Sequence, residues 1–130
     1  MNQMDLKTEL DSVFAECSAP NWDGYNGEPI GIETLKNAYL FMELLPDWTI
    51  APSIVPEPDG RIGFEWDDSP KNWILASVGP KGILYSIWEE SAWRPDWRCR
   101  LLDSIPPEIL TMLNKHFKLG SLGGPSNSSL

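Results

Sequence analysis

The sequence predicts an α+β protein: one antiparallel β-meander sheet of four or five strands, with two helices before it and one helix after it. Apolar residues recur at helical spacing over residues 1–45, alternate with period two over residues 61–88, and return to helical spacing after residue 105. We expect residues 1–119 to form a single domain. Residues 120–130, rich in Gly and Ser, are expected to form a flexible tail.

The N-terminal third contains the two predicted helices. Gln3 to Cys17 carries apolar side chains on one helical face, and Asn2 is a suitable N-cap. The opposite face is an acidic stripe made of Asp5, Glu9, Ser12 and Glu16. Ile32 to Leu45 is apolar over most of its circumference and is stopped by Pro46. We expect this helix to lie between the sheet and the first helix, because each of its apolar sides needs a neighbour.

The segment between these helices, Ser18 to Gly31, is rich in turn-forming residues. Asp23-Gly24 and Asn26-Gly27 favour tight turns with positive φ. Three side chains are expected to hold the loop against the protein: Trp22, Tyr25 and Ile30. The Asp and Asn spacing does not fit a calcium-binding loop, and two Cys and one His are too few for structural zinc. We therefore expect no metal and no cofactor.

Strands are predicted where apolar residues alternate between turns. Ser53 to Val55, between two prolines, is a short edge strand. Longer strands follow over 61–66, 72–78 and 83–88. The expected pairs are Val78 with Ile83, Ala76 with Tyr85 and Ile74 with Ile87, then Phe64 with Ile74 and Ile62 with Ala76. Both hairpins put the same residues on one buried face: Ile62, Phe64, Ile74, Ala76, Val78, Ile83, Tyr85 and Ile87.

The other face of the meander is expected to differ in character. It carries Glu65, Trp73, Leu75, Leu84, Ser86 and Trp88, with Trp73 opposite Trp88. After a loop over 89–96, a further strand is predicted from Trp97 to Leu101. A last helix opens at Ile105 to Glu108, because proline is tolerated in a first helical turn.

The net charge of −9 lies entirely in the first half: residues 1–60 hold eleven acids and two bases, and residues 61–130 hold eight of each. Nucleic acid and anionic lipid repel such a protein, so we expect neither as a direct partner, whereas a basic protein is compatible. The lack of a basic N-terminal signal and of a long apolar run predicts a cytoplasmic protein without a membrane span. Cys17 and Cys99 are then expected to be reduced, buried thiols.

The sequence carries none of the phosphate-loop, dinucleotide or hydrolase-nucleophile motifs. The carboxylates that an enzyme would have to use are Asp23 and Glu28, or Glu65, Asp67 and Asp68. Glu65 also has a structural explanation, an ion pair with Arg98 or Arg100. We therefore predict that the protein is not an enzyme. The alternative is a small carboxylate-dependent hydrolase or a glycan-binding module.

Two surfaces are predicted to bind a partner. The acidic surface consists of Asp5, Glu9, Glu16, Glu33 and Glu43. The tryptophan patch consists of Trp73, Trp88, Trp93, Arg94 and Trp97, and residues of these two types are enriched at interface hot spots. The competing interpretation is that the loop over 89–96 folds back and covers the patch, and that the acidic stripe is a solvated face.

Several segments also carry a family resemblance. They are Asn21-Trp22-Asp23-Gly24-Tyr25 followed by Pro29-Ile30, then Pro58-Asp59-Gly60-Arg61-Ile62 with Glu65-Trp66, and Ile105-Pro106-Pro107-Glu108. Over residues 20–115 the chain resembles a family of small bacterial proteins often met on plasmids and in mobile regions, although Gly27-Glu28 replaces the Gly-Ala or Gly-Leu common there. The resemblance assigns no catalytic residue. It implies a bacterial or phage source and an accessory role, such as one half of a toxin–antitoxin or defence pair. Together with the acidic charge, this role predicts a protein that inhibits or neutralises a macromolecular partner, as an antitoxin, an immunity protein or a nucleic-acid mimic does.

Overall fold

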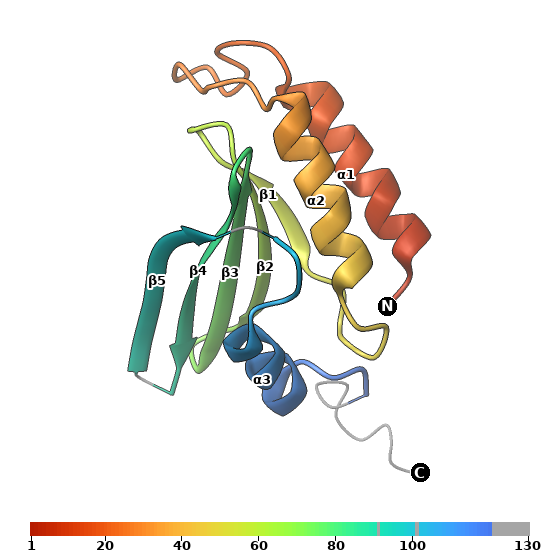
Figure 1. The fold of residues 1–130 in the computed structure, drawn as a ribbon, viewed down its shortest axis with the longest axis vertical. Coiled ribbons are helices and arrows are strands. Elements are labelled where there is room, and N and C mark those ends of the chain that lie inside the picture. The colour runs from red at the N-terminus through yellow and green to blue at the C-terminus, as the bar shows by residue number, and fades with distance from the viewer. Residues whose placement is uncertain (91, 101, 121–130) are drawn as a thin grey trace.

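The computed structural model describes residues 1–120, apart from residues 91 and 101. Within these residues the chain forms α1 (Gln3–Cys17), α2 (Ile32–Leu44), β1 (Ser53–Pro56), β2 (Ile62–Asp68), β3 (Asn72–Gly79), β4 (Gly82–Glu89), β5 (Ala92–Arg100) and α3 (Pro107–His116). The strands form one antiparallel sheet in the order β1-β2-β3-β4-β5 (Figure 1). This confirms the predicted α+β class. Beyond Gly120, the predicted tail lies outside the described residues.

The helices occupy one side of the sheet, and α2 lies between α1 and the strands (Figure 1). The Phe41 ring of α2 sits 4.8 Å from the Phe64 ring of β2, centroid to centroid. On its other side, Tyr39 donates a hydrogen bond to Asp11 of α1. The expectation that α2 has neighbours on two sides is confirmed. None of the described helices combines the length and apolar character that a membrane crossing requires.

The pairing of β3 with β4 is the predicted one, with Val78 opposite Ile83 and Ala76 opposite Tyr85. The predicted pairing of β2 with β3 is wrong by two residues, since Phe64 lies opposite Ala76. The cause is that β2 continues to Asp68 and leaves a loop of only residues 69–71. A shift of two residues preserves the face of every side chain, because side chains alternate with period two. The predicted core face is therefore correct despite the wrong register, and every member of it is buried.

The segment predicted as a loop over 89–96 is mostly strand. β5 starts at Ala92 and pairs with β4, with Trp93 opposite Trp88. Pro95 lies within this strand, and an edge strand tolerates proline because only one of its sides needs hydrogen bonds. As a result, residues 92–96 extend the sheet and do not fold over the tryptophans.

The core face provides a direct test of this packing. Phe64→Ala and Ile74→Ala each remove a side chain that is fully buried, so each should lower the free energy of unfolding by about 2–5 kcal/mol. Ile32→Ala, at a position 55% exposed, is the control and should change it by less than about 0.5 kcal/mol. Urea unfolding followed by tryptophan fluorescence measures all three. Equal effects at buried and exposed positions would contradict the assigned core.

Candidate functional site

The sheet face away from the helices is unusually apolar. An antiparallel sheet with one solvated side normally carries polar residues there. Here the outward-facing apolar side chains include Trp73, Leu75, Leu84, Trp88, Trp93 and Trp97. Trp88, Trp93 and Trp97 are 36%, 55% and 60% exposed. Exposed apolar surface of this kind is typical of interaction sites.

The strand register places three tryptophans in one line across the sheet. Trp73 of β3 lies opposite Trp88 of β4, which lies opposite Trp93 of β5. We call these three residues the tryptophan row. Asp67 of β2 lies opposite Trp73 and continues the line by one strand. The Trp97 ring packs edge-on against Trp93, with ring centroids 6.1 Å apart.

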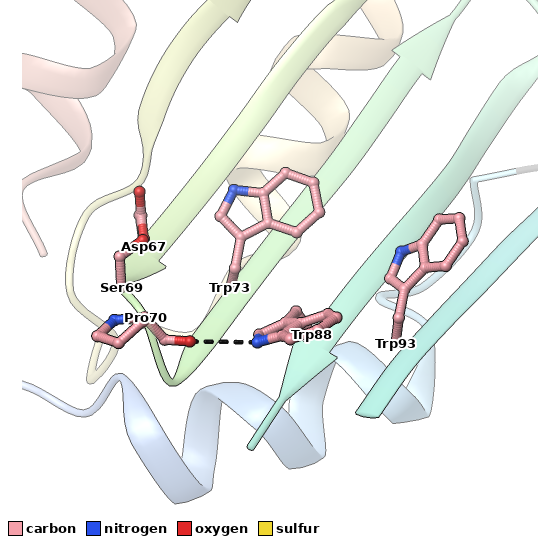
Figure 2. Close-up of a pocket in the computed structure, with 6 residues that line it drawn as sticks. All are labelled: Asp67, Ser69, Pro70, Trp73, Trp88 and Trp93. Carbon is pink, nitrogen blue, oxygen red and sulfur yellow. Dashed lines mark hydrogen bonds between the residues drawn. The ribbon is translucent and has the colours of Figure 1, made fainter. Parts of the chain in front are cut away.

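Each indole N–H of the row is bonded within the protein. Trp73 donates to the carboxylate of Glu65 at 2.7 Å, and Trp93 donates to the hydroxyl oxygen of Ser86 at 2.6 Å. Trp88 donates to the carbonyl oxygen of Pro70 at 3.2 Å (Figure 2). These bonds hold the rings in place, and they leave mainly ring carbons to meet a ligand.

A hollow of about 480 Å³ lies on the tryptophan row (Figure 2). The rest of its lining comes from Asp67 near the end of β2 and from Ser69 and Pro70 in the turn that follows. The Ser69 hydroxyl donates to the Asp67 carboxylate. Within the described part of the chain, no lysine or arginine forms an ion pair with Asp67. A second hollow adjoins it across Pro70 and Trp88, where its other lining residues are Lys71 and Glu90.

The opposite end of this face is closed by a polar network. Ser77 donates its hydroxyl to Glu57 at 2.7 Å, and Arg61 Nε donates to the Ser77 oxygen at 2.7 Å. Burial raises the pKa of the Glu57 carboxyl. A Cβ at Gly63 would lie 2.9 Å from a Glu57 oxygen, so glycine is needed there for Glu57 to reach across the strand. This network joins the turn before β2 to the middle of the sheet.

The acidic surface lies on the other side of the molecule from the tryptophan row. Its predicted members Asp5, Glu9, Glu16, Glu33 and Glu43 are all exposed, and they belong to α1 and α2. The helices cover one face of the sheet (Figure 1). The strand register places the tryptophan row on the other, open face. The two surfaces predicted to bind a partner are therefore separated by the thickness of the protein, and one flat interface does not include both.

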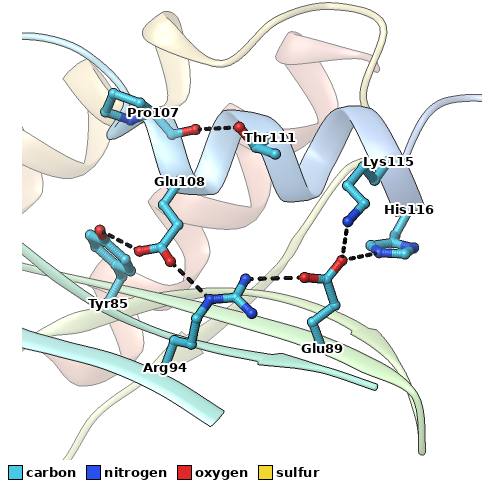
Figure 3. A network of polar contacts seen from close by, with 8 residues as sticks. All are labelled: Tyr85, Glu89, Arg94, Pro107, Glu108, Thr111, Lys115 and His116. Atoms are coloured by element: carbon cyan, nitrogen blue, oxygen red, sulfur yellow. Dashed lines mark hydrogen bonds and ion pairs between the residues drawn. The ribbon is translucent and has the colours of Figure 1, made fainter. Parts of the chain in front are cut away.

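Arg94 does not belong to the tryptophan patch, which corrects the prediction. It lies opposite Ile87 and so points to the helix side of the sheet. Its guanidinium bonds Glu108 of α3 at 2.9 Å and Glu89 of β4 at 3.2 Å (Figure 3). Period-two alternation sends Arg94 and its neighbour Trp93 to opposite faces, so Arg94 holds α3 against the sheet.

Glu89 lies at the centre of the ion pairs that hold α3 against the sheet, which we call the α3 clamp. Its carboxylate lies 2.7 Å from Lys115 Nζ and 2.7 Å from His116 Nε2, both at the end of α3 (Figure 3). Hydrogen bonds from Lys115 and His116, with a further one from Arg94, lower the pKa of Glu89 to about 2. The first residues of α3 bind through Glu108, which accepts a hydrogen bond from the Tyr85 hydroxyl at 3.0 Å.

Three smaller predictions are also corrected. Glu65 is bonded by the Trp73 indole, whereas Arg98 and Arg100 pair with Asp96 on their own strand. The Tyr25 side chain is 87% exposed and does not hold its loop. Cys99 is exposed, because odd-numbered positions of β5 face away from the core, whereas Cys17 is buried as predicted.

The loop over Asn21–Gly27 is organised by its own polar groups. The Asp23 carboxylate accepts hydrogen bonds from the backbone N–H groups of Tyr25 and Gly27, both at 2.8 Å. The positive φ expected in these turns occurs at Gly24 and Asn26. The Trp22 indole donates to the Glu28 carbonyl at 2.6 Å, and Ile30 is buried.

Sequence reasoning found the tryptophans of the row but did not place Asp67, Ser69 and Pro70 beside them. The reason is that the predicted turn between β2 and β3 was too long, since it began at residue 67 and the actual turn begins at residue 69. With a loop of three residues, Asp67 is carried opposite Trp73, and the turn residues lie at the end of the row. A search of family models, of curated proteins and of solved structures found no match to the chain. The function of this face is therefore inferred from its own residues.

We expect chelation to leave stability unchanged. Within the described residues no three His, Cys, Asp or Glu side chains gather as metal ligands, and Asp23 already accepts two backbone hydrogen bonds. A metal bound only by the folded state would raise the unfolding temperature, so its removal would lower it. Thermal unfolding with and without EDTA makes the measurement. A fall of several degrees would contradict the expectation and direct attention to the Asn21–Gly27 loop.

The lowered pKa of Glu89 predicts a pH-dependent contribution to stability. A carboxyl whose pKa is depressed in the folded state stabilises it above the unfolded pKa, and this contribution is lost as the pH falls toward 2. Glu89→Gln should cost about 1–2 kcal/mol at pH 7, because its partners Lys115 and Arg94 are partly exposed. The difference from wild type should shrink below pH 5. Urea unfolding across this range tests it, and Glu90→Gln, one residue along, should show no such trend.

Proposed function

We propose that the protein is an acidic protein-binding module that binds a basic protein partner through the open face of its sheet. The observation that carries the proposal is the tryptophan row, with Trp88 and Trp93 exposed on a face that the described helices leave free. Tryptophan dominates the energetics of many protein interfaces, since its large ring buries much apolar area and loses little conformational freedom.

The indole hydrogen bonds make this face suitable for tight binding. Ordering a flexible side chain on association reduces affinity by roughly 0.5–1.5 kcal/mol. Trp73, Trp88 and Trp93 are already oriented by Glu65, Pro70 and Ser86. When a partner stacks on these rings, little conformational entropy of the indole side chains is lost, so the affinity is reduced less.

Charge supports a basic protein as the partner. The chain has a net charge of −9, and Asp67 at the row has no basic ion-pair partner among the described residues. Single-stranded nucleic acid also stacks on aromatic platforms, but its phosphates would be repelled by this charge. The role suggested by the family resemblance, inhibition or neutralisation of such a partner, is compatible with this mode of binding and forms part of the proposal.

The acidic side chains of α1 have a different part in the proposal. They belong to α1, on the side of the sheet opposite to the row, so they would act through their long-range field and not by contact. Such a field raises the association rate and is screened by salt over about 8 Å at physiological ionic strength. Binding would thus depend on the two surfaces in kinetically distinct ways.

The test compares two tryptophans that are equally exposed. Trp88 of the row and Trp48 of the connector after α2 are both 36% exposed. A partner retained from a cell of the source is purified, and its binding rates are measured with each variant. Trp88→Ala should raise the dissociation rate about 30-fold or more, the equivalent of a hot spot of ~2 kcal/mol. Trp48→Ala should leave the rate unchanged.

The α1 variant completes the design. Changing Asp5, Glu9 and Glu16 together to Lys should slow association at low salt and leave dissociation unchanged. Equal rates for Trp88→Ala and Trp48→Ala would overturn the proposed interface. Selective retention of a glycan, and not of a protein, would favour the glycan-binding alternative. Sedimentation that shows a dimer lost in Trp88→Ala would assign the face to a second copy of this chain and overturn the proposal.

A further inference from the structure

We propose that the hollow on the tryptophan row is a receptor for one arginine side chain of the partner, with its guanidinium stacked on an indole and hydrogen-bonded to Asp67. This inference rests on the proposed function and identifies the chemistry that the face recognises. It follows from the lining of the hollow, which consists of aromatic rings, one carboxylate, and the turn residues Ser69 and Pro70 (Figure 2).

The lining offers hydrogen-bond acceptors and almost no free donors. All three indole N–H groups are bonded to groups of this chain. The Ser69 hydroxyl donates to Asp67, and Pro70 has no N–H. What a ligand meets is therefore a set of π faces together with carboxylate and carbonyl oxygens. A ligand rich in N–H donors and positive charge matches this set.

The same set of donors and acceptors disfavours sugars, phosphates and purely apolar side chains, which also bind at aromatic sites. A sugar presents hydroxyl oxygens that need donors as well as acceptors, and a phosphate needs donors alone. The side chains of this lining offer both of them few free donors. A purely apolar side chain would stack on the rings but would make no use of the exposed carboxylate of Asp67.

Arginine fits this hollow better than lysine. The guanidinium is planar and weakly hydrated, so it stacks on indole faces, and its rigid fork of N–H groups binds a carboxylate in two places. Attraction of a cation to a ring is strongest over tryptophan. The hollow of about 480 Å³ lies within the range of roughly 300–1,000 Å³ typical of ligand pockets. It is thus large enough to take a long side chain whose backbone stays outside.

Asp67 has the charge that such a site needs. It lies in line with the tryptophan row through its pairing with Trp73. In the described ranges, the arginines of this chain that form ion pairs do so with Glu89, Asp96 and Glu108, away from the hollow. The partner's guanidinium would supply the missing counter-charge, and the tryptophans would supply the stacking surface.

The inference is tested with peptides that do not require the natural partner. The probe is a five-residue peptide with one central Arg between Gly residues, capped at both ends, and its twin carries citrulline, which is neutral and of the same shape. Titration is followed by the indole N–H signals of ¹⁵N-labelled protein. We expect the Arg peptide to shift the signals of the tryptophan row saturably, and the citrulline peptide to bind at least about tenfold more weakly.

A matched pair of variants tests the role of the carboxylate. Asp67 and Asp103 are both exposed, and each accepts a hydrogen bond from a nearby serine hydroxyl. Asp67→Asn should weaken binding of the Arg peptide about fivefold to tenfold, and Asp103→Asn should not change it. A far-ultraviolet circular dichroism spectrum identical to wild type shows that each variant is folded.

The outcomes separate this inference from the proposed function. Equal binding of the Arg and citrulline peptides, equal binding of a Lys peptide, or no effect of Asp67→Asn would each overturn the arginine site. The proposed function would still stand if Trp88→Ala released the purified partner. In contrast, selective binding of the Arg peptide that depends on Asp67 supports the arginine site, whatever the natural partner.

Discussion

The pairing of β2, β3, β4 and β5 is the constraint on which the rest of this structure depends. Because side chains alternate along a strand, the contacts that bury Ile74 and Ile87 under the helices also send Trp73 and Trp88 to the open face. A slip of one residue would expose the core and bury the indoles. The stability of the core and the exposure of the tryptophan row are therefore two results of one register.

The edge strand β5 shows how closely the two faces are coupled. Trp93 and Arg94 are adjacent in the chain, and the strand sends one side chain to each face. Arg94 bonds Glu108 and Glu89 and so helps to hold α3 on the sheet (Figure 3). That clamp keeps β5 in place, and β5 in turn supplies Trp93 as the last member of the row. The ion pairs of Arg94 on the helix-covered face thus help to hold Trp93 in its place in the tryptophan row on the open face.

Few kinds of ligand suit the open face, because the polar groups around the tryptophan row already form hydrogen bonds with one another. Glu65, Ser86 and Pro70 accept the indole protons, and Ser69 bonds Asp67. The acidic helices add a field of the same sign from the far side of the molecule. In our proposal, this stacking surface and the charge of Asp67, which forms no ion pair within the described residues, suit the face to cationic groups of a protein. The composition also shows the excess of acidic residues, but it does not say where on the surface they lie.

The sequence by itself determined the fold class, the boundaries of α1 and α2 to within a residue, the core face of the sheet and the opposition of Trp73 and Trp88. Those features follow from local periodicity and from turns whose residues limit the backbone. The tertiary structure alone decided the position of β5, the direction of Arg94 and the placement of Asp67 beside the tryptophans. Each depends on turn length or on pairing between strands. The pairing of β5 with β4 turns the predicted loop over 89–96 into a strand, and the three-residue loop after β2 sets the register of β2 with β3. Periodicity specifies which face a side chain takes, but only the assembled sheet decides which side chains meet there.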